Sequence, residues 1–190
     1  MVEDVWLRLI VMNDDDPWQQ YALIFSELHL KAIKWVRDCL IRENLPLPVT
    51  TETAIEAAEK WIRGGKNWRQ LEEISRQAGI VRDNAQCNLA HTNTLEQTRQ
   101  TIDLEIATLL GAFLDALVKL DPDWQKEELA KEFSAFHTPR QIRNYASQII
   151  KDSVLSHIPF ALVEIFGQDN TAWEERMIDE VVAIYVAEMA

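Results

Sequence analysis

Residues 102–120, "IDLEIATLLGAFLDALVKL", carry the clearest structural signal in the chain. Their apolar residues recur at spacings of three and four, like the residues on one face of a helix. Together with Leu95 they predict a long helical region over 80–120, with a break near "HTNT" at 91–94. The residues expected on its apolar face are Leu95, Ile102, Ile106, Leu109, Leu110, Phe113, Leu114 and Leu117.

Helix start signals are frequent on both sides of this stretch. An acid or a threonine directly before proline occurs at 16–17, 121–122 and 138–139. Such a side chain can accept from free backbone N–H groups, and proline fits the first turn of a helix. Capping-box spacing at 53–56 and 171–174 predicts two further helix starts.

Helix ends are predicted by the glycines at 64–65, 79 and 167. The prolines at 46 and 48 also exclude a helix there. The helices expected from these signals cover 17–43, 53–63, 67–78, 80–120, a short stretch after 122, 139–156, 159–167 and 171–190.

The chain length of 190 residues fits one domain with its own core. Only five glycines and six prolines leave few tight turns, and we find no convincing strand. The one candidate strand, "VWLRLIVM" at 5–12, fits a first helix equally well. We therefore expect an all-α fold: a single domain over 1–190, built as an irregular bundle of eight or nine helices.

The sequence also indicates a compartment. Its start, "MVEDVWLRLIVMNDDD", has no basic region before a short apolar run, so it does not resemble a signal peptide. No stretch of 18 apolar residues occurs, so we expect no membrane span. Cys39 and Cys87 lack CxxC spacing, and we expect both to be reduced, buried thiols. These features predict a cytoplasmic protein.

The formal net charge of −12 is concentrated at the two ends of the chain. Residues 1–30 hold six acidic side chains against one arginine, and residues 159–190 hold seven against one arginine. If the two ends meet in the fold, they form an acidic face that repels nucleic acid and attracts basic proteins. The alternative is that these acids only keep the protein soluble.

Three consecutive aspartates, Asp14, Asp15 and Asp16, precede Pro17. We expect Asp16 to begin a helix, where acids suit the positive N-terminal end. A calcium loop needs alternating acids and a glycine, which "NDDDPW" lacks. We therefore expect no metal here and include the three aspartates in the acidic face.

The sequence contains no catalytic motif. Zinc proteases use H-E-x-x-H and di-iron bundles use Glu-x-x-His. Neither pattern occurs at any of the four histidines, which are His29, His91, His137 and His157. No G-x-S-x-G, Walker loop or G-x-G-x-x-G occurs either. We therefore expect no enzyme activity and no cofactor.

Seven tryptophans are many for this length, and four of them, Trp18, Trp68, Trp124 and Trp173, lie near predicted helix starts. Large rings at helix ends commonly pack on the core, which is the reading we favour. The alternative is that some of these rings line an interface, where tryptophan is a preferred anchor.

Residues 67–91 resemble a helix-turn-helix, with the turn expected at Gly79 and Ile80 among the core positions. The surroundings are locally basic, because residues 63–82 hold five basic side chains against two glutamates. The side chains that would contact DNA are Arg69, Arg76 and Arg82. The remaining negative charge argues against nucleic acid, and a structural helix pair is the alternative.

Three segments follow one another in the middle of the chain. "KWVRDC" (34–39) is a Trp-containing helix ending near a cysteine, and "AIEAAEKWIRG" (54–64) is an Ala- and Trp-containing helix ending at glycine. "SRQAGIVRDNA" (75–85) contains alanines and scattered arginines. This succession, over about 28–118, resembles an all-helical family of immunity proteins from bacterial polymorphic toxin systems. The resemblance implies a cytoplasmic, non-catalytic protein that binds and neutralises a toxin domain.

These observations lead us to expect a binding protein whose acidic face receives a basic partner, with a toxin domain as the specific hypothesis. The candidate partner-binding residues are Asp14, Asp15, Asp16, Glu174 and Glu175. The alternatives are a DNA-binding regulator that uses 67–91, and a helical ligand-binding or catalytic protein whose pocket the sequence does not reveal. Apolar stripes on many helices leave room for a homodimer.

Overall fold

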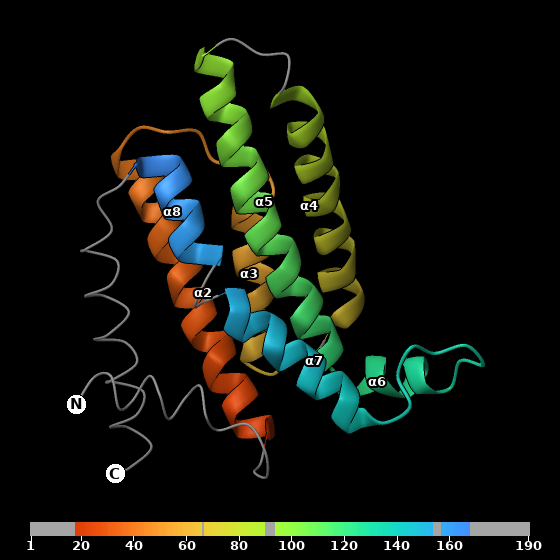
Figure 1. The fold of residues 1–190 in the computed structure, drawn as a ribbon. Coiled ribbons are helices and arrows are strands. Elements are labelled where there is room, and N and C mark those ends of the chain that lie inside the picture. The colour runs from red at the N-terminus through yellow and green to blue at the C-terminus, as the bar shows by residue number, and fades with distance from the viewer. Residues whose placement is uncertain (1–17, 66, 90–93, 154–156, 168–190) are drawn as a thin grey trace, which may run out of the picture.

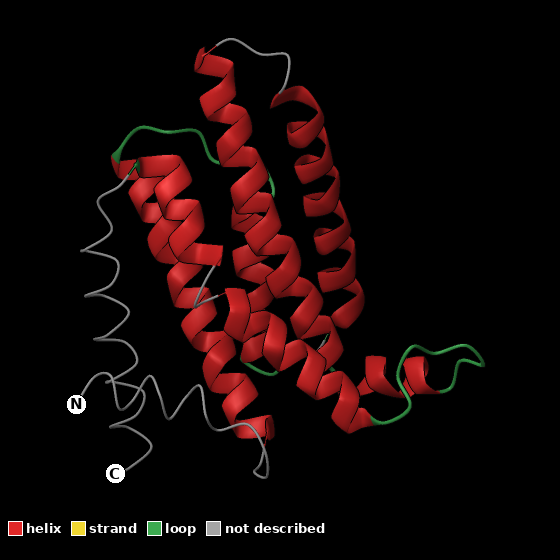
Figure 2. Cartoon of the chain, in the orientation of Figure 1, coloured by secondary structure: helices red, strands yellow, loops and turns green. Residues whose placement is uncertain are grey.

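The computed structural model describes residues 18–65, 67–89, 94–153 and 157–167. These residues form seven helices and no strand, which confirms the predicted all-helical class (Figure 2). The helices are α2 (Trp18–Arg42), α3 (Thr51–Ile62), α4 (Trp68–Leu89), α5 (Thr94–Leu120), α6 (Pro122–Leu129), α7 (Pro139–Asp152) and α8 (Ile158–Phe166).

Three expectations concern residues outside these ranges. They are the strand-or-helix alternative at 5–12, the helix start at 16–17 and the last helix at 171–190. The total of eight or nine helices therefore stays a prediction.

Helix α5 lies at the centre of the fold, and each of the other described helices contacts it. In Figure 1, α4 runs antiparallel to α5 on one side, and α2 and α8 lie on the other side. Helix α7 crosses α5 near the C-terminal end of α5. The predicted apolar face is buried, apart from Leu95, whose side chain is not described. The buried apolar residues of α5 are Ile102, Ile106, Ala107, Leu109, Leu110, Phe113, Leu114, Ala116, Leu117 and Val118.

Helices α4 and α5 approach closely because small residues meet between them. A Cβ atom built on Gly111 would lie 3.9 Å from the Cβ of Ala78 and 3.9 Å from the carbonyl oxygen of Ser75. The Ser75 hydroxyl donates to the Gly111 carbonyl at 3.1 Å. A long side chain at position 111 would therefore push α4 away from the centre of the fold.

The predicted turn at Gly79 is wrong, because α4 runs unbroken from Trp68 to Leu89 and Gly79 has no positive φ. One glycine inside a helix costs about 1 kcal/mol, which burial of one side of α4 offsets. The same register turns Ile80 outward, 49% exposed, although the sequence placed it in the core. The buried residues of α4 are Leu71, Ile74, Ala78 and Ala85.

Side chains cap two of the predicted helix starts, at 67 and at 138–139. The Asn67 side chain, just before α4, accepts from the backbone N–H of Gln70 at 3.3 Å. Thr138 and Gln141 form a capping box at the start of α7, in which each side chain accepts from the other residue's backbone N–H. Both arrangements satisfy N–H groups that the first helical turn leaves free.

Helix α3 begins earlier than predicted and ends where predicted. Its first residue is Thr51, so the expected capping box at Thr53 does not form. The turn starts sooner because the Thr51 N–H donates to the carbonyl of Pro48 at 3.0 Å. At the other end the Gly65 N–H donates to the Lys60 carbonyl at 2.8 Å. A Cβ on Gly65 would lie 2.7 Å from that oxygen, so only glycine allows this approach.

Asp121 joins three helices through one buried carboxylate. It caps α6 by accepting from the backbone N–H groups of Asp123 at 2.9 Å and Trp124 at 3.4 Å. Its second oxygen accepts from the indole N–H of Trp61 in α3 at 3.0 Å. The side chain follows directly on α5 and is fully buried. The predicted Asp-Pro helix start therefore also fixes α3 against the end of α5.

The tryptophans with described side chains pack against the core, as the favoured reading predicted. They are Trp35, Trp61, Trp68 and Trp124, each of which is partly buried.

Replacing Gly79 with alanine distinguishes a continuous helix from a turn. We expect Gly79→Ala to raise the free energy of unfolding by about 0.5–1 kcal/mol, because alanine favours the helical state. Gly64→Ala is the control, since Gly64 has a φ of +92° that alanine adopts poorly. Urea denaturation of both variants measures the difference. A loss of stability for Gly79→Ala similar to that for Gly64→Ala would contradict a continuous α4.

Removing the Asp121 carboxylate should destabilise the fold strongly. We expect Asp121→Ala to lower the free energy of unfolding by about 2–4 kcal/mol, because a helix cap is lost and the Trp61 indole loses its acceptor. Asp123→Asn, at an exposed position two residues further along, should change the free energy of unfolding by less than about 1 kcal/mol. Denaturant titration compares the two, and equal losses would show that Asp121 is not the joining group.

Candidate functional site

The five acidic residues expected to bind a partner lie outside the described residues, so the structure does not place them. They are Asp14, Asp15, Asp16, Glu174 and Glu175. The hypothesis that the two acidic ends meet therefore stays a prediction.

The three arginines expected to contact DNA lie on α4, and each one pairs with a carboxylate. The pairs are Arg69–Glu127 at 2.9 Å, Arg76–Glu73 at 2.6 Å and Arg82–Asp83 at 2.8 Å. The hydrogen bond from Arg76 holds the pKa of the Glu73 carboxyl below its usual range. These pairs are exposed and stabilise the fold little, but they cancel much of the positive charge that a phosphate backbone would meet.

An acidic pair lies between α5 and α8. Burial, and then the nearby carboxylate of Glu164, raise the pKa of the Glu105 carboxyl. No ion pair joins either residue to a cation within the described part of the chain. Glu164 belongs to the acidic C-terminal stretch that the sequence indicated, and it is the one acid of that stretch within the described residues.

A buried polar cluster lies where α2 crosses α7. His29 of α2 is fully buried, and its Nε2 atom lies 3.0 Å from the hydroxyl oxygen of Ser153. The imidazole ring packs on Phe113 of α5 with ring centroids 4.3 Å apart. Burial, and then nearby His157, lower the pKa of His29 to about 3. The ring is therefore neutral at physiological pH, and it links three helices.

The tautomer of His29 follows from its surroundings. Its Nδ1 atom is buried and has no hydrogen-bond partner among the described residues. An unpaired N–H buried there would cost more free energy than a bare ring nitrogen. We therefore place the proton on Nε2, from which it is donated to the Ser153 hydroxyl. Ser153 is fully buried, so this Ser–His pair positions helices and does not reach a substrate.

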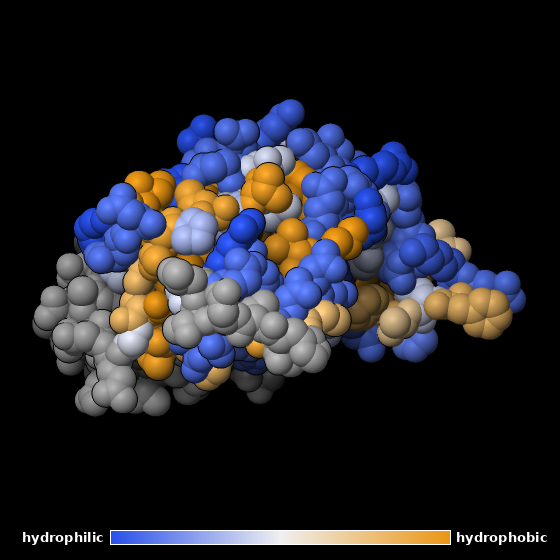
Figure 3. Space-filling view, turned by 90° about the horizontal axis from the view of Figure 1, so that it is seen from above, coloured by the Kyte–Doolittle hydropathy of each residue, from blue (hydrophilic) through white to orange (hydrophobic). Residues whose placement is uncertain are grey.

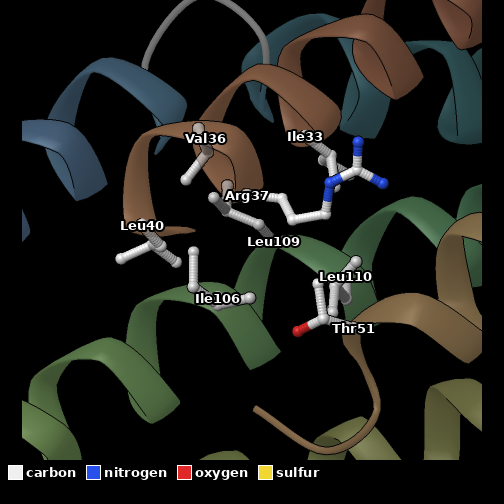
Figure 4. Close-up of a pocket in the computed structure, with 8 residues that line it drawn as sticks. All are labelled: Ile33, Val36, Arg37, Leu40, Thr51, Ile106, Leu109 and Leu110. Atoms are coloured by element: carbon white, nitrogen blue, oxygen red, sulfur yellow. The ribbon is translucent and has the colours of Figure 1, made fainter. Parts of the chain in front are cut away.

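A small pocket lies between α2, α3 and α5 (Figure 4). Its volume is about 10 Å³, enough for one water molecule and far too small for a substrate. Thr51 supplies a buried hydroxyl without a hydrogen-bond partner in the described part of the chain, and Arg37 extends along the edge. The remaining lining residues are apolar: Ile33, Val36, Leu40, Ile106, Leu109 and Leu110.

The two cysteines differ in environment. Cys39 is a buried free thiol, as expected, and burial raises its pKa. Cys87 is also free but exposed, so the prediction that both are buried is wrong for this residue. Ala85 faces α5, and residue 87 lies about 200° further round the helix, which turns it to solvent.

Two searches of the described residues gave negative findings. No group of three or more histidine, cysteine, aspartate or glutamate side chains is placed to hold a metal ion in these ranges. No helix within them combines the length and the apolar character that a membrane crossing requires.

Sequence reasoning missed the features that depend on distant residues. His29 and Ser153 are 124 residues apart, and no local pattern links them. Glu164 likewise acts on Glu105 only because α8 packs on α5. The exposed Phe133, which lies in the connection between α6 and α7, also had no sequence signal.

Comparisons with protein families, with curated proteins and with solved structures found no match to this chain. The resemblance to immunity proteins therefore rests on the sequence pattern alone.

The pKa of His29 makes stability depend on pH. The folded-state pKa of about 3 lies below the ordinary value of 6.5, so the unfolded chain binds a proton that the folded chain excludes. The stabilisation that comes from keeping His29 neutral is complete above pH 6.5. As the pH drops below 6.5 this stabilisation decreases, by at most about 1.4 kcal/mol per pH unit.

We expect the free energy of unfolding, measured by urea titration from pH 7 to 5, to fall in the wild type. This slope should be reduced in His29→Gln and retained in His137→Gln, because His137 is exposed. An equal slope in wild type and His29→Gln would contradict the assignment.

Proposed function

We propose that this chain is a non-catalytic binding protein for a basic protein partner, and that its specific role is to neutralise a toxin domain. The specific role comes from the sequence resemblance. The choice of a basic protein over DNA comes from the distribution of charge on the described helices.

One observation carries this choice. The arginines on α4 already have carboxylate partners, whereas Glu105 and Glu164 have no cationic partner within the described ranges. A basic protein would supply the charge that this acidic pair lacks, and its approach would be accelerated by the net charge of −12.

The shape of α4 weakens the DNA-binding alternative. Its recognition helix depended on a turn at Gly79, and α4 is continuous there. DNA binding through Arg69, Arg76 and Arg82 stays a prediction that a salt-dependent mobility shift with duplex DNA tests. Ligand binding, a homodimer and a cytoplasmic location also stay predictions.

The proposal is tested by purification of the tagged full-length chain from its source organism at low and moderate salt. We expect one basic protein, released as salt rises, because screening weakens attraction between exposed charges. Recovery of nucleic acid without such a protein would contradict the proposal.

Charge reversal tests the predicted acidic face once the partner is purified. We expect replacement of Asp14, Asp15, Asp16, Glu174 and Glu175 by lysine to slow association about tenfold or more at low salt, with little change in dissociation. We expect association to change more than stability does. A companion variant that keeps Asp16 separates the loss of a helix start from the loss of the acidic face, because Asp16 is expected to begin a helix. Stopped-flow or surface-binding kinetics measure both rates.

The matched control reverses five exposed acids away from both ends, which produces the same change in net charge. Suitable residues are Asp38, Glu43, Glu52, Glu56 and Asp83. Equal slowing in both variants would show that overall charge acts, without a localised acidic face.

A further inference from the structure

The connection between α6 and α7, residues 130–138, extends away from the helical bundle (Figure 1). We call this segment the α6–α7 loop. In Figure 3 the same projection reaches beyond the rest of the molecule and carries both apolar and hydrophilic surface. Phe133 lies in it and is 90% exposed, the highest value among the exposed large apolar residues of the described chain.

Hydrogen bonds hold the loop in one conformation. The Glu128 carboxylate, at the end of α6, accepts from Lys131 and from the Ser134 hydroxyl, the latter at 3.2 Å. The Ser134 hydroxyl in turn accepts from the Phe136 N–H at 3.1 Å. These contacts flank Phe133 on both sides, so the bend that presents it is fixed.

The C-terminal half of the loop is anchored to α7. The Gln141 side chain accepts from the N–H groups of His137 at 2.8 Å and Thr138 at 3.1 Å. The Phe136 ring packs on Tyr145 with centroids 5.6 Å apart. Phe136 is therefore used to attach the loop, whereas Phe133 makes no such contact in the described structure.

An exposed aromatic on a fixed loop is suited to binding. Phenylalanine exposed to water gives up the free energy that its burial would contribute, about 1.5–3 kcal/mol. A loop already held in one conformation loses little conformational entropy when a partner covers it. Such anchors, inserted in a pocket of the partner, carry much of the energy of protein interfaces.

The surroundings of the loop indicate the chemistry of that partner. Arg140, at the start of α7, is one cation beside the loop. Eight further charged residues lie on α6, on the loop and on the neighbouring start of α4, and five of them are acids. They are Arg69, Glu72, Asp123, Lys126, Glu127, Glu128, Lys131 and Glu132. The three cations are all paired: Arg69 with Glu127, Lys126 with Asp123, and Lys131 with Glu128. Glu132, directly before Phe133, has no ion pair within the described residues, whereas Glu72 interacts electrostatically with Lys131.

We propose that the α6–α7 loop is a docking element that inserts Phe133 into an apolar pocket bordered by basic side chains on a protein partner. This inference rests on the proposed function, because it names a second contact made by the same basic partner. Glu132 meets the basic border of the pocket, while Phe133 supplies the apolar contact.

The test uses the full-length chain and the partner purified with it. Phe133→Ala should weaken binding at least about 30-fold in calorimetry, as the loss of an interface anchor does. Val49→Ala is the control, because Val49 is 87% exposed and lies in a different connection, between α2 and α3. It should leave affinity unchanged. Neither variant should lower the melting temperature, since both side chains are exposed.

A second pair of measurements distinguishes insertion of Phe133 into the partner from a change in the conformation of the loop. Ser134→Ala removes a bond that fixes the loop, so it should weaken binding less than Phe133→Ala does. A photoreactive benzoylphenylalanine at position 133 should crosslink to the partner, whereas the same residue at position 49 should not.

The outcomes distinguish the two proposals. If the wild-type chain binds no basic protein, the proposed function fails and this inference fails with it. If the partner binds and Phe133→Ala retains wild-type affinity, only this inference is overturned. Phe133-dependent binding to neutral phosphatidylcholine vesicles would also overturn it, because a lipid surface would then be the ligand.

Discussion

The need to cover α5 on several sides determines how the other helices are arranged. Ala116, Leu117 and Val118 are consecutive and all buried. Consecutive residues point about 100° apart around a helix, so no single neighbour can cover the three of them. Helices α2, α3, α4, α6, α7 and α8 all contact α5 as a result. Each fully buried leucine or phenylalanine contributes about 1.5–3 kcal/mol, which favours this arrangement over ones that leave α5 exposed.

Buried polar groups then fix positions that apolar packing alone leaves free. Asp121 sets where α5 ends and α6 begins, and its bond to Trp61 fixes α3 at the same point. The His29–Ser153 bond does the same where α2 crosses α7. Both are hydrogen bonds across helices, and each would leave a buried group unpaired if the helices shifted. Helices α4 and α5 are positioned by small residues instead. Gly111 and Ala78 let the two helices approach closely and so set their separation.

The proposed function depends on surface features, which this core holds in place. The acidic pair of Glu105 and Glu164 lies where α8 packs on α5, and the α6–α7 loop is anchored by α6 and α7. Charge acts over about 8–10 Å at physiological salt, so it would influence how fast a basic partner arrives. Phe133, presented by a fixed loop, would act only on contact and would influence how long the partner stays bound. On this proposal the two surfaces would have separate kinetic effects, which separate variants can measure.

The sequence by itself determined the local features of this protein. The period of residues 102–120 gave the central helix, and Asn67, Asp121-Pro122 and Thr138-Pro139 gave helix starts, because caps and periodicity act within a few residues. Only tertiary structure decided that α4 continues through Gly79, since packing on α5 outweighs the local preference of one glycine. The same holds for the neutral, buried His29, whose partner Ser153 is 124 residues away, and for the exposure of Phe133, which follows from the way α6 and α7 hold their loop. Interactions between residues far apart in the chain depend on how the helices pack, and a single sequence carries no local signal for them.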